Sequence, residues 1–271
     1  MSASATTSSQ TGKVLGREML PPPETGLETY TGPWDFAAAA HLLRRATFGP
    51  TKDVIDQALE LGLDGTITKL FESLPMPAPP VYYDYDDDPN AALGETWIDQ
   101  PVAVVQGLNF SRRKSLSSWT MELMLEEGIS LREKMSLFWH NHFAVNRNGV
   151  NDARFFYRYI TTIRSQAWGN FRQLVKDMTV DPTMLRFLNG NQNTANAPNE
   201  NYARELLELF TIGKGPLVGP GDYTNYTEED VVQMAKVLTG WRDRGHNNAN
   251  PDIPLESYLT TSRHNGSDKQ L

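Results

Sequence analysis

The chain has 271 residues, of which 39% are hydrophobic, and its formal net charge at pH 7 is −8. This length and composition are ordinary for a folded protein with a substantial core, and the acidic balance argues against nucleic acid as the main partner. The absence of cysteine excludes disulfides, thiolate zinc sites and cysteine nucleophiles together. No apolar stretch approaches the roughly 20 residues of a transmembrane helix.

Residues 1–30 predict a disordered N-terminal arm. They are rich in Ser, Thr, Ala and Gly and contain the run LPPPETG, whose prolines block a helix while the small polar residues bury little surface. No secretory signal peptide is readable in this arm, because its charges are not followed by an apolar segment. Residues 31–271 are predicted to form a single helical domain.

The domain begins with two segments of helical periodicity. In WDFAAAAHLLRRATFG, apolar residues recur on one face of the predicted helix: Phe36, Ala40, Leu43 and Ala46. The next segment, TKDVIDQALELG, ends at Gly62, a residue type that often follows the last helical turn. His41, Arg44 and Arg45 could bind phosphate or sulfate through two side chains on one face, or could simply form a basic surface edge.

The segment LREKMSLFWHNHF, residues 131–143, predicts a helix that carries two histidines. Ser130 and Glu133 have the spacing of a capping box at its start. On an ideal helix, residues two apart point about 200° away from each other. His140 and His142 could therefore share a metal only if the helix ended near Trp139. Otherwise the two histidines have different partners. At least one of them could then be a metal ligand or catalytic residue, or both could be buried or capping residues.

A further helix is predicted in PNENYARELLELFTIG, residues 198–213. Arg204 and Glu205 fall in its first two turns, and Glu205 could present its carboxylate beside that of Glu208, three residues later. Such a carboxylate pair near a histidine would suit a divalent metal or acid–base chemistry. Alternatively, Glu205 forms a structural ion pair with an arginine such as Arg44 or Arg45.

Taken together, these residues give a candidate site. The predicted metal ligands are His140, His142 and Glu205, holding one divalent ion, and the predicted catalytic residues are Glu205, His140 and Arg204. A metal held in this way would activate water for hydrolysis. In the alternative, His140, Arg204 and Glu205 lock helices together in a scaffold that has no catalytic function.

The last predicted helix lies in YTEEDVVQMAKVLTGW, residues 226–241. Thr227 is its N-cap, and Gly240 ends it. The acidic residues of its first turn are stabilised by the positive end of the helix dipole. Strands find almost no support anywhere in the sequence. The predicted fold is all-α, an irregular multi-helix bundle with long loops.

Five ordered blocks resemble a bacterial family, the one catalogued as domain of unknown function 1800. They are HLLRRATFGPT, LREKMSLFWHNHF, DPTMLRFLNGNQN, PNENYARELLELFTIG and YTEEDVVQMAKVLTGW, between residues 41 and 242. Family members are typically exported, and their genes often neighbour those of a second exported family related to sulfatases. The resemblance therefore implies a periplasmic or extracellular location and a sulfatase-like partner. It implies no reaction.

The resemblance also implies a longer protein. Family members usually continue through a histidine–aspartate pair and a further helical half, whereas the corresponding place here is His264-Asn265 and the chain stops at Leu271. We therefore expect a truncated larger helical domain, incomplete at its C-terminus. The functions that remain open are an exported metal-assisted hydrolase and a non-catalytic scaffold or partner. Carbohydrate binding through Trp139, Trp168 and Trp241 is less favoured, because tryptophans in helical patterns usually belong to the core.

Overall fold

A computed structural model describes residues 28–83, 88–102, 105, 107–146, 149–220, 222–223 and 225–271. The chain divides into two compact units, Met1–Pro33 and Trp34–Leu271. In the described part of the first unit, residues 28–33, the Tyr30 hydroxyl donates a hydrogen bond to the Pro33 carbonyl over 2.9 Å. Most of the predicted disordered arm thus lies outside the described residues, and its disorder stays a prediction.

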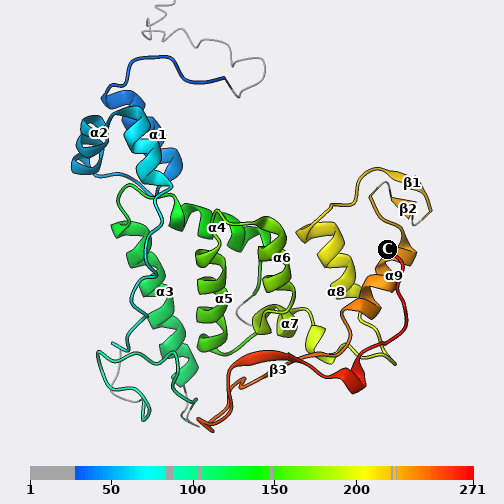
Figure 1. The fold of residues 1–271 in the computed structure, drawn as a ribbon. Coiled ribbons are helices and arrows are strands. Elements are labelled where there is room, and N and C mark those ends of the chain that lie inside the picture. Colours follow the sequence, from blue (N-terminus) through cyan, green and yellow to red (C-terminus); the bar gives the residue numbers. More distant parts are fainter. Residues whose placement is uncertain are drawn as a thin grey trace, which may run out of the picture. The chain divides into compact units, whose positions relative to one another are not determined.

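The second unit is mainly helical (Figure 1). Its α-helices are α1 (Phe36–Ala46), α2 (Lys52–Leu70), α3 (Leu108–Glu126), α4 (Arg132–His142), α5 (Ala153–Ser165), α6 (Phe171–Thr179), α7 (Pro182–Phe187), α8 (Glu200–Glu205) and α9 (Glu228–Val237). Helix α8 continues as a π-helix, Leu206–Phe210, and short 3-10 turns span Gly190–Gln192 and Thr261–Arg263.

The prediction of an all-α fold is wrong, because the described residues also form two antiparallel two-stranded sheets. One pairs β1 (Leu217–Gly219) with β2 (Asp222–Tyr223), and the other pairs β3 (Trp241–Arg244) with β4 (Glu256–Leu259). Strands of four residues or fewer are too short to show the alternation of a longer strand. Contacts between residues on opposite strands stabilise the pairing instead, as in the ion pair between Arg244 of β3 and Glu256 of β4.

Helix α1 has the predicted face, with one exception. Ala40, Leu43 and Ala46 are buried, but Phe36, in the first turn, is 47% exposed. The predicted end at Gly62 is a kink within α2: Gly62 adopts φ +70°, and a second helical stretch continues to Leu70. Glycine takes this left-handed conformation without a Cβ penalty, which explains why the break occurs there.

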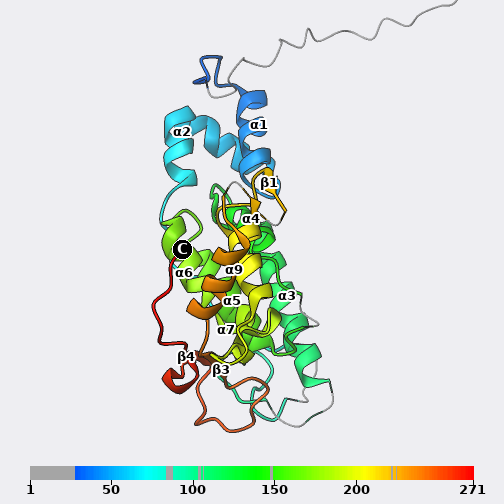
Figure 2. The same cartoon turned by 90° about the vertical axis from the view of Figure 1, so that its right-hand side faces the viewer.

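Apolar side chains gather in three buried clusters within the second unit. One lies between α1 and α2, a second joins α3 to α5, and the largest lies among α4 to α9. Helix α4 packs against both α5 and α3, and in Figure 1 it crosses their upper ends. Figure 2 shows the same helices from the side, with β3 and β4 below them. Helices α3, α4 and α5 thus meet where the largest and second clusters adjoin.

The predicted capping box at the start of α4 is wrong. Ser130 Oγ does accept from the Arg132 N–H over 3.2 Å, but the reciprocal bond from Glu133 is missing. Instead Oε1 of Glu127, just beyond α3, accepts from the Glu133 backbone N–H and the Ser130 hydroxyl, both over 2.8 Å. The Glu133 side chain is therefore free to turn inward, where it is fully buried. The bond to Glu127 thus leaves the Glu133 side chain for an interaction with α5.

The predicted starts of α8 and α9 are confirmed. The Asn199 side chain accepts a hydrogen bond from the Tyr202 N–H over 3.1 Å, and Thr227 and Asp230 form a reciprocal capping box. The wider turn of the π-helix that follows α8 brings the Phe210 carbonyl within 2.9 Å of His142 Nε2. The end of this π-helix is thereby tied to α4.

Candidate functional site

Helix α4 continues through His142, so its two histidines lie on different faces. His140 Nδ1 lies 3.1 Å from the Tyr159 hydroxyl of α5, whereas His142 Nε2 lies 2.9 Å from the Phe210 carbonyl. His142 also packs edge-on against the rings of Trp139 and Phe143. The structure therefore gives each histidine its own partner, as an unbroken helix requires.

The hydrogen bonds of Tyr159 assign the tautomer of His140. The Tyr159 hydroxyl donates its only proton to the Phe143 carbonyl over 2.9 Å, so it must accept a proton from His140 Nδ1. Burial lowers the pKa of His140 and favours the neutral ring. Nε2 is then the unprotonated nitrogen, and it makes no hydrogen bond to the described residues. His140 thus offers an acceptor to a ligand.

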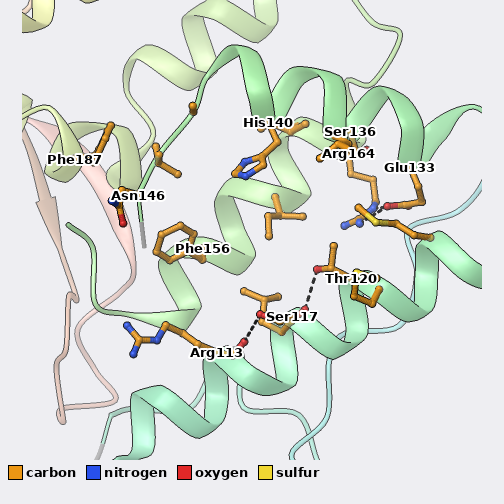
Figure 3. Close-up of a pocket in the computed structure, with 18 residues that line it drawn as sticks. Arg113, Ser117, Thr120, Glu133, Ser136, His140, Asn146, Phe156, Arg164 and Phe187 are labelled. Carbon is orange, nitrogen blue, oxygen red and sulfur yellow. Dashed lines mark hydrogen bonds and ion pairs between the residues drawn. The ribbon is translucent and has the colours of Figure 1, made fainter. Parts of the chain in front are cut away.

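His140 lines a cavity of about 730 Å³ between α3, α4 and α5. Figure 3 shows its side chain pointing into this space from α4, with α3 on the opposite side. The cavity continues past the segment after α4 to Phe187 of α7. Most of the wall is apolar, including Leu116, Met121, Met124, Leu137, Phe156 and Ile160. A cavity of this size and lining is typical of small-molecule sites.

One end of the cavity holds a buried ion pair. Arg164 of α5 donates from Nε and Nη2 to the two carboxylate oxygens of Glu133, over 2.8 and 2.6 Å, and both side chains are 1% exposed. The guanidinium also lies 4.8 Å from the centre of the Trp119 ring. Its Nη1 is buried and has no hydrogen-bond partner among the described residues. Such a donor is costly to leave unpaired, and it is therefore suited to a ligand acceptor.

Three hydroxyls line the cavity as acceptors. Ser117 and Thr120 of α3 donate to the Arg113 and Leu116 carbonyls over 2.9 Å, as drawn in Figure 3. Ser136 of α4 donates to the Arg132 carbonyl over 2.8 Å. Because each hydroxyl has one proton and donates it to its own helix, only its lone pairs are left for a ligand.

Arg204 and Glu205 lie outside this cavity. Arg204 donates to both carboxylate oxygens of Glu228 on α9, over 2.7 and 2.6 Å, while Glu208 accepts from the Tyr226 hydroxyl over 2.9 Å. Glu205 makes no ion pair or hydrogen bond through its side chain within the described residues. The alternative pairing of Glu205 with an arginine of α1 is therefore wrong, and it is Arg204 that joins two helices.

Nowhere in the part of the chain that the structure describes do three His, Asp or Glu side chains gather as metal ligands. His140 binds Tyr159, His142 binds the π-helix, and Glu205 belongs to α8. The structure thus brings none of the three predicted ligands into a shared site. Metal binding by His140, His142 or Glu205 stays a prediction.

Comparison with known families gives one match. The model of the family described as "Protein of unknown function (DUF1800)" matches residues 41–271. The chain belongs to this family. No curated protein and no solved structure matches it. None of the helices in the described part of this family member is long and apolar enough to span a membrane.

The sequence contained one indication of the cavity that the prediction missed. Glu133, Ser136 and His140 recur at helical spacing, which places a polar stripe on one side of α4. Arg164, in the segment ARFFYRYITTIRS of α5, has no distinguishing pattern around it. The tryptophan considered for carbohydrate binding on α4, Trp139, is partly buried: it packs against the largest core cluster, and its indole donates to the Ala167 carbonyl over 2.8 Å.

Proposed function

We propose that this chain binds a small amphipathic molecule in the cavity between α3, α4 and α5. The observation that carries the proposal is a space of about 730 Å³ with apolar walls and two unused polar atoms, Arg164 Nη1 and His140 Nε2. Small-molecule sites are typically apolar cavities in which a few polar groups orient the ligand. Both atoms belong to side chains held in place by further hydrogen bonds.

A hydrolytic activity, if the family has one, would use His140 in this cavity. Because His140 is neutral and its Nδ1 is held by Tyr159, Nε2 is oriented to take a proton from a water or hydroxyl group. Metal assistance would need ligands beyond His140, and the described residues supply no such cluster. We therefore propose ligand binding, with proton transfer at His140 as the chemistry open to it.

The scaffold function is favoured by a different part of the molecule. The Arg204–Glu228 pair joins α8 to α9 and leaves both charges satisfied, which is the arrangement of a structural contact. The periplasmic or extracellular location and the sulfatase-like partner rest on the family resemblance alone, and they stay predictions. A scaffold would need no ligand-binding cavity, so a measurement of ligand binding distinguishes the proposed function from the scaffold function.

Fluorescence titration with N-phenyl-1-naphthylamine, a neutral apolar probe, tests the proposal. We expect saturable binding at one site in the unaltered chain and its loss in Thr120→Phe, which fills the cavity with a ring. Thr68→Phe is the matched control: Thr68 makes the same hydrogen bond to the carbonyl four residues earlier, but is exposed on α2. Equal binding by both variants would place the probe outside the cavity and overturn the proposal.

A further inference from the structure

The hydrogen-bonding groups of the cavity are mostly acceptors. Ser136 and Thr120 have donated their protons to α4 and α3, and His140 presents the unprotonated Nε2. Arg164 Nη1 is a donor that makes no hydrogen bond within the described residues. A ligand that satisfies this end of the cavity must therefore donate to the acceptors and accept from Arg164. A carboxylate only accepts, so it would leave the three acceptors unpaired.

The charges around this end also balance without a ligand. Glu133 binds Arg164, with Arg132 Nε 3.4 Å from the same carboxylate, and the Glu127 carboxylate caps the helix behind them. Among the described side chains here, two carboxylates thus accompany two guanidiniums, and no excess positive charge remains to offset a buried anion. Transferring an anion into such a place costs several kcal/mol unless a counter-charge is provided. A neutral ligand avoids that cost.

Among the described residues that line the cavity, the remaining arginine lies away from this end. Arg113 lines the cavity from the start of α3, and Figure 3 shows it apart from the Glu133–Arg164 pair. An anionic ligand that used Arg113 would place its charged group there and its apolar part elsewhere. A site for a neutral ligand and a site for an anion therefore predict opposite orders of affinity for molecules that share an apolar chain and differ only in their polar group.

We infer that the ligand is an apolar molecule with a neutral polar group that both donates and accepts hydrogen bonds, such as a primary amide or an alcohol. This group lies between Arg164, Ser136 and His140, and the apolar part lies along Leu116, Met124 and Ile160. The inference rests on the proposed function, since it names the chemistry of the molecule that the same cavity binds.

Competition against N-phenyl-1-naphthylamine tests the inference with three matched probes, octanamide, 1-octanol and octanoate, at about pH 8, where the acid is ionised. We expect octanamide and 1-octanol to displace the dye, and octanoate to bind at least about tenfold more weakly. Octanoate that binds equally well or more tightly would overturn the inference while leaving the cavity a ligand site. Absence of dye binding would instead overturn the proposed function itself.

A pair of serine variants locates the polar group. Ser136→Ala removes one acceptor from the cavity and should weaken octanamide about three- to tenfold while leaving octanoate unchanged. Ser165→Ala is the control, because Ser165 donates within α5 in the same manner but is exposed. An unchanged affinity for octanamide in Ser136→Ala would contradict the assigned position. If octanoate binds tightly and Arg113→Gln abolishes that binding, the ligand is an anion held by Arg113 and the inference is wrong.

Discussion

The same pair of residue types occurs in two environments of this molecule. In Glu133–Arg164 and in Glu228–Arg204, an arginine donates two hydrogen bonds to a glutamate over 2.6 to 2.8 Å. The first pair is 1% exposed on both sides and lines a cavity, whereas the side chains of the second are 47% and 33% exposed. Residue type and hydrogen-bond geometry alone therefore do not mark a site. The Glu133–Arg164 pair is distinguished by its burial and by Arg164 Nη1, a donor without a partner among the described residues.

The largest effect is expected from the buried pair. Glu133→Gln leaves the Arg164 charge buried without a counter-ion, and breaking such a pair typically costs about 3 to 5 kcal/mol. Urea unfolding at neutral pH measures this loss as a lower midpoint at an unchanged slope.

The double variant Glu133→Gln/Arg164→Gln is the control for this prediction, because it removes both charges. Replacing a buried pair as a whole is often neutral, so most of the stability should return. A single-variant loss below about 1 kcal/mol would mean that water in the cavity solvates Arg164 as well as Glu133 does. The distinction between the two pairs would then fail.

Asp181 gives a third environment, a buried carboxylate without an ion pair in the described residues. It caps α7 by accepting from the Thr183 and Met184 N–H groups over 2.8 and 3.2 Å, and burial raises its pKa from 3.8 to about 6. Between these pH values the folded state binds more protons than the unfolded state, so the contribution of Asp181 to stability falls as pH rises. Above about pH 6 the loss is complete.

The size of this loss is on the order of 3 kcal/mol, and the stability difference between the unaltered chain and Asp181→Asn isolates it. Asparagine keeps a capping oxygen but does not titrate. We expect the difference, unaltered minus variant, to decrease from pH 4 to pH 6 and to be constant above that. A difference that rises with pH would mean that the Asp181 carboxylate is stabilised in the fold, as Glu133 is by Arg164.

The two histidines of α4 provide a smaller contrast. His142→Phe removes the hydrogen bond to the Phe210 carbonyl but keeps a ring against Trp139, and should cost about 1 kcal/mol. It should leave dye binding unchanged, because His142 does not line the cavity. His140→Phe should retain much of the packing against Tyr159 and weaken octanamide binding. Weakened ligand binding in His142→Phe would show that the two faces of α4 are not independent.

Sequence patterns predicted the local structure better than the partners of each side chain. The start of α8, the N-cap Thr227 and the break at Gly62 depend on neighbours within a few residues, so they could be predicted. The strands β3 and β4 depend on a pairing across 11 intervening residues, from 245 to 255, and they are too short to show a pattern alone.

Of the predicted site residues, His140 lines the cavity. His140 was chosen because a second histidine follows two residues later in the same helix, and its metal and catalytic roles stay predictions. Its partner Tyr159 could not be predicted, since it lies 19 positions further along the chain and reaches His140 only through the packing of α4 on α5. Arg204 was predicted as a catalytic residue together with its neighbour Glu205. Only the structure shows that Arg204 binds Glu228 of α9.

The smallest stability effect is expected at Glu228. The hydrogen bond from Arg204 lowers the pKa of Glu228, so the pair contributes stability above the unfolded-state value of 4.5 and loses it as pH falls through the lower folded value. Because both side chains are partly exposed, Glu228→Gln should cost no more than about 1 kcal/mol at neutral pH, and less in about 1 M salt. Unfolding in urea at two salt concentrations measures both effects. A loss as large as that of Glu133→Gln, unaffected by salt, would mean that α8 and α9 hold Arg204 as tightly as the cavity holds Arg164, and that exposure does not separate the two pairs.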